Sequence, residues 1–175
     1  IGPNGKLTAL GCATTDPTLP AQHDLIFLND GNKFNAMRGP PVKDPEQLGF
    51  AYVAQAALDL DGDGDLDLVQ VRTGRRLRIL RNDMIKLGGY VNVRLVGKGG
   101  NTGAVGATVE AKVGTKTMLR HIGASGFGGT AWHRVHFGLG TAKAIDEIIV
   151  HWPTGTQVSV VKNVAAGTTE VIKQP

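Results

Sequence analysis

The chain of 175 residues is 41% hydrophobic and 19% charged, a balance that allows a packed core and excludes global disorder. Its formal net charge is +4, and five of its 15 acidic residues stand in the run from Asp59 to Asp67, so the remainder is mildly basic. Dispersed basicity favours solubility over nucleic-acid binding. No apolar run reaches the ~20 residues of a membrane span. The lone cysteine, Cys12, excludes an internal disulfide.

The first fifty residues contain few regular elements. Residues 1–23 are rich in Gly, Pro and Thr and predict an irregular N-terminal arm. The apolar run 25–28 predicts a strand, and the Asn-Asp-Gly-Asn sequence at 29–32 predicts the turn that follows it. Pro40, Pro41 and Pro45 indicate a loop.

An acidic loop separates two segments that have the character of strands. Residues 50–57 are apolar and fit a strand or a short helix, and we favour a strand because the acidic loop follows at once. Residues 66–71 predict the strand that leaves the loop. A further strand is predicted at 76–81, where Leu77 and Ile79 alternate with two arginines. This period of two is typical of a half-exposed strand whose arginines face solvent. Because no aromatic residue is interleaved with the arginines, a nucleic-acid patch is not favoured.

The composition changes near Asp83, and we place a domain boundary at residues 83–88. From there, short apolar segments alternate with glycine-containing turns at intervals of roughly ten residues. Seven strands are predicted, at 90–96, 107–113, 117–122, 133–137, 147–152, 157–161 and 168–172. Since no segment has a long helical period, we expect an all-β chain whose C-terminal part is a small sandwich or barrel.

The acidic run Asp59-Leu60-Asp61-Gly62-Asp63-Gly64-Asp65-Leu66-Asp67 is the strongest chemical signal in the sequence. Calcium takes six to eight oxygen ligands, and carboxylates at alternate positions of a turn can surround one ion. The expected ligands are Asp59, Asp61, Asp63 and Asp67 through their side chains, and Asp65 through its main-chain carbonyl. The two glycines allow a sharp turn. Without a cation, the crowded carboxylates would repel one another.

The flanks of this loop argue against a helix-loop-helix sensor. Counted from Asp59, the twelfth position is Gln70, where an EF-hand has a bidentate glutamate, and residues 68–71 have the character of a strand. We therefore expect a calcium loop between strands, with a dissociation constant in the ~10⁻⁴–10⁻³ M range of extracellular modules. Such an ion stabilises the loop and performs no chemistry.

Residues 59–69, with the sequence DLDGDGDLDLV, resemble the FG-GAP/VCBS repeat, the calcium-loop blade of integrin-like β-propellers. Residues 24–34 (DLIFLNDGNKF) look like the end of a preceding repeat that lacks its own acidic loop. The resemblance implies one and a half blades over residues 24–85. Because a propeller needs at least four blades, we expect either the C-terminal fragment of a longer propeller or blades completed by another chain, and we favour the fragment.

Three motifs farther along resemble the ASPIC/UnbV domain. They are NTGAVGA at 101–107, HFGLG at 136–140, and WPTG at 152–155 followed by Lys162-Asn163-Val164. This family commonly follows FG-GAP/VCBS repeats at the C-terminal end of secreted proteins, including the cartilage acidic protein group. The resemblance implies a β domain over residues 88–175, a secreted, extracellular or periplasmic location, and a role in adhesion or recognition without a defined catalytic activity.

Other reactive side chains have plainer explanations. His133 and His136 are three residues apart on a predicted strand and face opposite sides, so we expect His136 to be a hydrogen-bonded structural residue. Ser125 lies in a glycine run that does not complete the G-x-S-x-G spacing of a nucleophile, and no α/β pattern surrounds it. Asp146 and Glu147 are adjacent on a strand and face apart, which argues against a glycosidase pair.

The two tryptophans and the cysteine also have structural explanations. Trp132 and Trp152 are expected to anchor the core or a turn, although an exposed Trp132 beside the glycine run 126–129 would line a recognition surface. Cys12 has no partner for a zinc or redox pair. An inert loop cysteine is the expectation, with an intermolecular thiol as the alternative.

These observations predict an all-β, calcium-stabilised binding or scaffold module outside the cell, in which partial β-propeller blades precede a small β-sandwich or barrel-like domain. The expected cofactor is Ca²⁺, and the expected partner is a protein, a glycan or another chain of an assembly. No nucleic acid and no enzymatic activity are expected. Two alternatives stay open. In the first, the chain is a non-catalytic accessory domain of a secreted enzyme, which a convergent His/acid pocket would favour. In the second, it is a subunit of an extracellular filament or surface assembly.

Overall fold

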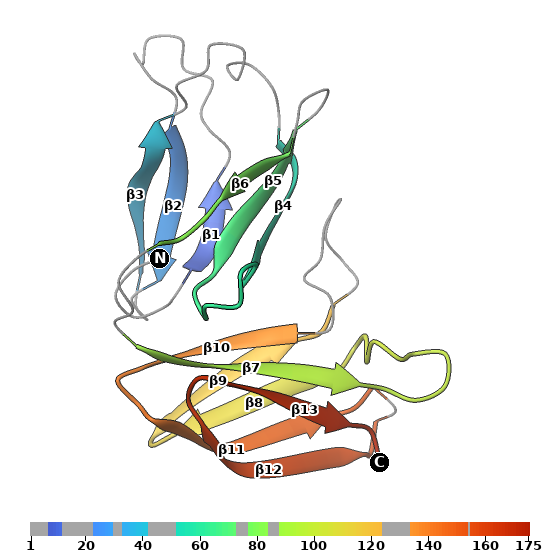
Figure 1. Ribbon diagram of the computed structural model, residues 1–175. Helices are drawn as coiled ribbons and strands as arrows, with labels where there is room; N and C mark the ends of the chain where they lie inside the picture. Colours follow the sequence, from blue (N-terminus) through green and yellow to red (C-terminus); the bar gives the residue numbers. More distant parts are fainter. Residues whose placement is uncertain are drawn as a thin grey trace.

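The computed structural model describes residues 7–11, 23–29, 33–41, 52–72, 77–83, 88–123, 134–153 and 155–175. Within these ranges the chain is all-β, as predicted. Thirteen strands form four sheets, none of which closes into a barrel (Figure 1). In this part of the chain, no helix has the length and apolar character needed to cross a membrane.

The strands of the first half form two antiparallel sheets, with the orders β1-β2-β3 and β4-β5-β6. The strands are β1 (Leu7–Gly11), β2 (His23–Asn29), β3 (Phe34–Pro41), β4 (Tyr52–Leu58), β5 (Asp67–Arg72) and β6 (Arg78–Leu80). Strands β2, β4, β5 and β6 confirm the predicted ones. Two expectations are wrong. Leu7–Gly11, predicted as part of an irregular arm, pairs with β2, and Pro40 and Pro41, predicted as loop, end β3.

The β4-β5-β6 sheet presents an apolar face to solvent, contrary to the expectation for residues 76–81. Leu77 is 57% exposed and Ile79 is 49% exposed. Arg78 is instead partly buried, and its Nη1 donates a hydrogen bond to Oε1 of Gln70 at 3.4 Å. Gln70 is buried and lies opposite Arg78 in the register. The alternation was predicted correctly, but the polar side is the buried one, because Gln70 supplies an acceptor there.

The seven strands of the C-terminal half form a sandwich of two sheets. One sheet has the order β10-β7-β13, in which β7 runs antiparallel to β10 and parallel to β13, and the other has the order β12-β11-β8-β9. The strands are β7 (Gly89–Val96), β8 (Thr108–Val113), β9 (Lys116–His121), β10 (Arg134–Gly140), β11 (Ala144–His151), β12 (Val158–Ala165) and β13 (Thr168–Lys173). All seven predicted strands are confirmed, and the arrangement is a sandwich.

The hydrophobic core lies between these two sheets. Val91 and Val93 of β7, Phe137 of β10, and Ile148 and Val150 of β11 are all 0% exposed and belong to one cluster. Alternate residues of a strand face the same side, which is why apolar residues two apart meet in this core. Burial of each such side chain stabilises the fold by about 1.5–3 kcal/mol.

The outer face of the β10-β7-β13 sheet points away from the core. Tyr90, Asn92 and Arg94 alternate with the core residues of β7 and therefore lie on this face. Arg94 and the neighbouring Thr169 of β13 are exposed, whereas Asn92 is only 6% exposed. Figure 1 shows the loop between β4 and β5 reaching toward β7 and β10 on this side. The loop accounts for the burial of Asn92.

Of the motifs that resemble the ASPIC/UnbV domain, those that begin at Asn101 and Trp152 form turns of the sandwich, whereas residues 136–140 belong to β10 and residues 162–164 belong to β12. The side chain of Asn101 accepts the N–H of Val105 and donates to its carbonyl, both at 2.9 Å. Trp152 is buried, and its Nε1 donates to Oγ of Ser159 at 2.9 Å. Trp152 is thus a turn anchor, as expected. These motif residues have structural roles.

Truncation of a core valine should destabilise the chain far more than the same change at the surface. Val150→Ala removes two buried methyl groups and leaves a cavity, so we expect a loss of about 2–3 kcal/mol in the free energy of unfolding. Val160 on the adjacent strand β12 is 51% exposed, and Val160→Ala should change it by about 0.5 kcal/mol or less. Urea denaturation followed by circular dichroism measures both. Equal losses would contradict the placement of the core.

Candidate metal centre

The acidic loop connects β4 to β5, whose pairing extends to Leu58 opposite Asp67. Gly62 and Gly64 have φ values of +80° and +97°. This left-handed backbone conformation is strained for residues that have a side chain. Inside the turn, the N–H of Asp63 donates to Oδ1 of Asp61 at 3.3 Å, and the N–H of Asp65 donates to Oδ1 of Asp63 at 2.9 Å. These bonds hold two carboxylates against the loop's own backbone.

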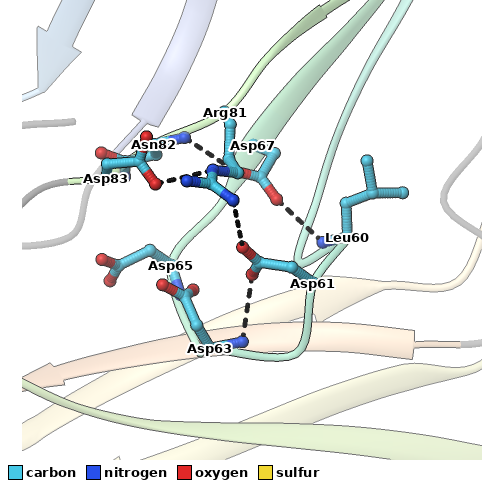
Figure 2. A network of polar contacts seen from close by, with 8 residues as sticks. All are labelled: Leu60, Asp61, Asp63, Asp65, Asp67, Arg81, Asn82 and Asp83. Carbon is cyan, nitrogen blue, oxygen red and sulfur yellow. Dashed lines mark hydrogen bonds and ion pairs between the residues drawn. The ribbon is translucent and has the colours of Figure 1, made fainter.

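Asp67 closes the base of the loop. It is 1% exposed, and both of its carboxylate oxygens accept main-chain hydrogen bonds (Figure 2). Oδ2 accepts the N–H of Leu60 at 2.9 Å, and Oδ1 accepts the N–H of Asn82 at 2.8 Å. Asn82 follows β6, so this one side chain joins the loop to the end of the third strand. Asp67 therefore supports the base of the loop, and its role as a ligand stays a prediction.

Three carboxylates of the loop converge. One oxygen each from Asp59, Asp61 and Asp63 lies within 4.8 Å of the other two. The side chains of Asp65 and Asp67 are outside this group, and the carbonyl of Asp65 stays a predicted ligand. An all-oxygen group of this kind is the ligand set of hard cations such as Ca²⁺. The structure therefore brings together three of the five predicted ligand residues.

One oxygen of the Asp59 carboxylate is an atom to which a bound cation would give a partner. Its Oδ1 is buried and has no hydrogen-bond partner among the described residues. A buried carboxylate oxygen without a partner is destabilising, because its hydration is lost and nothing replaces it. A cation held between Asp59, Asp61 and Asp63 would replace that hydration and offset the repulsion between the three charges.

Arg81 lies at the exposed rim of the loop. Its Nη1 is 4.0 Å from Oδ2 of Asp61, and its Nε is 2.6 Å from Oδ1 of Asp83 (Figure 2). The hydrogen bond to Asp83 is the main reason why the pKa of Arg81 is raised. The side chain of Arg81 is 61% exposed, and solvent weakens an ion pair of this kind. Arg81 therefore does not neutralise the three carboxylates.

The acidic loop also contacts the C-terminal domain, a contact that the sequence did not predict. Nδ2 of Asn92 in β7 donates a hydrogen bond to Oδ2 of Asp59 at 3.3 Å. Oδ1 of the same amide lies 3.0 Å from Nδ1 of His136 in β10. The His136 ring stacks on Tyr90, with ring centroids 5.9 Å apart. Gly64 lies so close to Tyr90 that a Cβ at position 64 would overlap the ring.

A weak signal for this contact exists in the sequence. Asn92 is a polar residue between Val91 and Val93, in a strand whose alternate residues are apolar. A solvent-facing asparagine gives the same pattern, so the pattern alone cannot distinguish an exposed side chain from one covered by a distant loop.

His136 is hydrogen-bonded, as expected. Burial lowers the pKa of His136 below its usual value of 6.5; the negative charge of Asp59 opposes this shift, and the positive charge of Arg120 adds to it. The ring is therefore neutral at pH 7. A neutral ring that donates its Nδ1–H to Asn92 fixes the amide with its Nδ2 toward Asp59.

A pocket of about 250 Å³ lies where the loop meets the C-terminal domain. It is lined by Ala57, Leu58, Asp59, Leu66, Asn92, Arg134 and His136. This is smaller than the ~300–1,000 Å³ of typical small-molecule sites. Asp59 and His136 are both hydrogen-bonded to Asn92, which stands between them. The pocket is therefore part of the contact between the two halves.

The remaining candidate residues lie apart from this site. Asp146 accepts the N–H of Gly114 at 2.6 Å, while Glu147 pairs with Lys112 at 2.7 Å, so the two acids have different partners, as expected. His121 lies 3.3 Å from Oγ1 of Thr108, and His151 lies 3.1 Å from Oε1 of Glu110. The predictions for Cys12, Ser125, Trp132 and His133 fall outside the described residues.

Residues 97–175 match the family described as ASPIC and UnbV. The match confirms the resemblance of the C-terminal part of the chain to that family. It begins after β7, although β7 is the central strand of its sheet. Among curated proteins, no match to the chain is found.

Replacement of Asp67 should destabilise the loop even without metal. Asp67→Asn exchanges one buried acceptor oxygen for an NH₂ group that faces a main-chain N–H, so we expect a loss of about 1–3 kcal/mol in the free energy of unfolding. Asp61→Asn in the same loop relieves repulsion between carboxylates and should leave stability in EDTA unchanged or higher. Chemical denaturation in EDTA compares the two variants. A larger loss for Asp61→Asn would contradict the role given to Asp67.

The lowered pKa of His136 should appear in the dependence of stability on pH. As pH falls below about 6.5, the unfolded chain takes up the proton before the folded chain does, so stability is complete above that pH and is lost below it. His136→Gln should remove this part of the loss. Urea midpoints at about pH 7.5 and 5.5 measure it, with the exposed His151→Gln as the control. An unchanged loss in His136→Gln would contradict the burial of a neutral ring.

Proposed function

We propose that this chain is a calcium-stabilised binding or scaffold module, in which an FG-GAP/VCBS-type blade precedes an ASPIC/UnbV domain. The observation that supports it most strongly is the group of Asp59, Asp61 and Asp63 with the unpaired, buried Oδ1 of Asp59. The ion would neutralise the turn between β4 and β5 and so stabilise the hairpin. Its function would be structural.

The geometry of the loop favours calcium over magnesium. Ca²⁺ accepts six to eight oxygens in irregular geometry, whereas Mg²⁺ requires near-ideal octahedral geometry and gives up its water reluctantly. The three carboxylates differ in burial, since Asp61 is exposed while Asp59 and Asp63 are partly buried. Such an uneven group at the surface suits a cation that accepts ligands in an irregular arrangement.

A secreted or periplasmic location and a role in recognition are part of the same proposal. Domains of the ASPIC/UnbV family typically stand at the C-terminal end of larger, often extracellular proteins. The partner would be a protein, a glycan or another chain. The apolar face formed by Val71, Leu77 and Ile79, each at least 39% exposed, supports a contact with a further sheet.

The pocket beside His136 and Asp59 is the observation that favours an enzyme-associated role. However, Asp59 and His136 are both hydrogen-bonded to Asn92. A catalytic acid and base must instead lie within hydrogen-bond reach of the substrate. His121 and His151 also lie beside polar side chains. We therefore propose a binding module without catalytic activity.

Calcium should raise the thermal stability of the chain. With a dissociation constant of ~10⁻⁴–10⁻³ M, a calcium concentration of about 10 mM should stabilise the folded state by about 1.4–2.7 kcal/mol relative to EDTA. For a chain of this size, the gain corresponds to a rise in Tm of several degrees, about 3–10 °C. Differential scanning calorimetry measures it, and Mg²⁺ at equal concentration should give less.

The double variant Asp61→Asn, Asp63→Asn should abolish this rise. The matched control is Asp83→Asn, which removes a carboxylate that pairs with Arg81 but lies outside the group. It should retain the calcium response. A wild-type Tm that is equal in calcium and in EDTA would overturn the proposed function.

A further inference from the structure

Asn92 is buried on the outer face of the β10-β7-β13 sheet, where Tyr90 and His136 beside it are partly buried. Its neighbours on the outer face of the sheet, Arg94 along β7 and Thr169 across on β13, are exposed, whereas Asn92 is 6% exposed. The group that reaches Asn92 is Asp59, the first carboxylate of the acidic loop. A polar side chain covered in this way needs a specific partner, since burial removes its water.

His136 orients the side-chain amide of Asn92. Its Oδ1 is 3.0 Å from Nδ1 of His136, which leaves Nδ2 to donate to Oδ2 of Asp59 at 3.3 Å. Oδ2 of Asp59 is thereby engaged, while Oδ1 of Asp59 has no hydrogen-bond partner in the part of the chain that the structure describes. The carboxylate thus has one oxygen held by the C-terminal domain and one available to a cation. Residues that hold a metal ligand in this way fix its orientation.

Gly64 and Tyr90 form a second contact between the same two parts. Gly64 is buried against the Tyr90 ring, which stacks on His136 at an interplanar angle of 15°. A side chain at position 64 would overlap that ring, whereas at Gly62 an added Cβ would meet nothing within 4 Å. Both glycines have a positive φ, so a side chain strains the backbone at either position. The two positions therefore differ in the contact with Tyr90 alone.

Resting on the proposed cation site, we propose that the C-terminal domain completes this site. Asn92 is a positioning residue for Asp59, and a cation bound by Asp59, Asp61 and Asp63 in turn stabilises the contact between the acidic loop and the β10-β7-β13 sheet. Coupling of this kind is reciprocal. If the contact raises the affinity for the cation, the cation strengthens the contact by the same factor.

Calcium titration calorimetry of the full chain tests the first half of this proposal. Asn92→Ala should weaken calcium binding by about tenfold, as is typical when the partner of a metal ligand is removed. Thr169→Ala, on the same face and exposed, should bind calcium like the wild type. Gly64→Ala should weaken calcium binding more than Gly62→Ala does. When each is combined with Tyr90→Ala, most of that difference should disappear, because the ring that a Cβ at position 64 would overlap is then absent.

A second measurement separates positioning from general destabilisation. Hydrogen exchange of the β7 and β10 amides should slow on addition of calcium in the wild type and in Thr169→Ala. It should not change in Asn92→Ala or in Asp61→Asn, Asp63→Asn. If Asn92 only stabilised the fold, Asn92→Ala would exchange faster in all conditions and would still respond to calcium.

The two proposals fail in different ways. If the wild type binds calcium and Asn92→Ala binds it equally well, the positioning role is overturned while the calcium module stands. If Gly64→Ala and Gly62→Ala behave alike, the contact with Tyr90 has no part in binding. If the wild type binds no calcium, both proposals are overturned.

Discussion

The crowding of three carboxylates at the turn between β4 and β5 is the constraint on which the rest of this structure depends. Asp59, Asp61 and Asp63 lie close enough to share one ion, and their charges repel one another without it. The protein itself satisfies only part of this demand. Backbone N–H groups bond to Asp61 and Asp63, and the C-terminal domain bonds to one oxygen of Asp59. The second oxygen of Asp59 has no hydrogen-bond partner among the residues described.

The two halves of the chain also meet at this loop, as far as the described residues show. The sandwich holds β7 rigidly, because Val91 and Val93 face its core, and alternation then places Asn92 on the opposite face. The hairpin of β4 and β5 holds Asp59 from the other side, through the buried Asp67 at the base of the loop. The two parts therefore meet at the hydrogen bond between Asn92 and Asp59 and at the contact between Gly64 and Tyr90. This arrangement suits a module in which a bound cation would stabilise the contact between the acidic loop and the β10-β7-β13 sheet.

The sequence predicted local features well and contacts between distant segments poorly. The seven strands of the sandwich follow from apolar residues alternating between glycine turns, and the acidic loop follows from its composition. The side of β6 that is buried was predicted wrongly, because Gln70 provides an acceptor for Arg78 that periodicity does not reveal. The contact of Asp59 with Asn92 joins residues 33 positions apart. The local pattern around Asn92 does not name its partner, and for the same reason the sequence explains Gly64 by its turn and not by Tyr90.

Native mass spectrometry of the chain, sprayed from calcium and from EDTA, tests the central claim most directly. The account predicts one calcium ion per folded chain, lost in EDTA, and lost also in calcium when Asp59 is replaced by asparagine, since that change removes a charged ligand. Asp83→Asn should keep the ion. A wild-type chain that carries no calcium, or an Asp59→Asn chain that still carries one, would contradict the account.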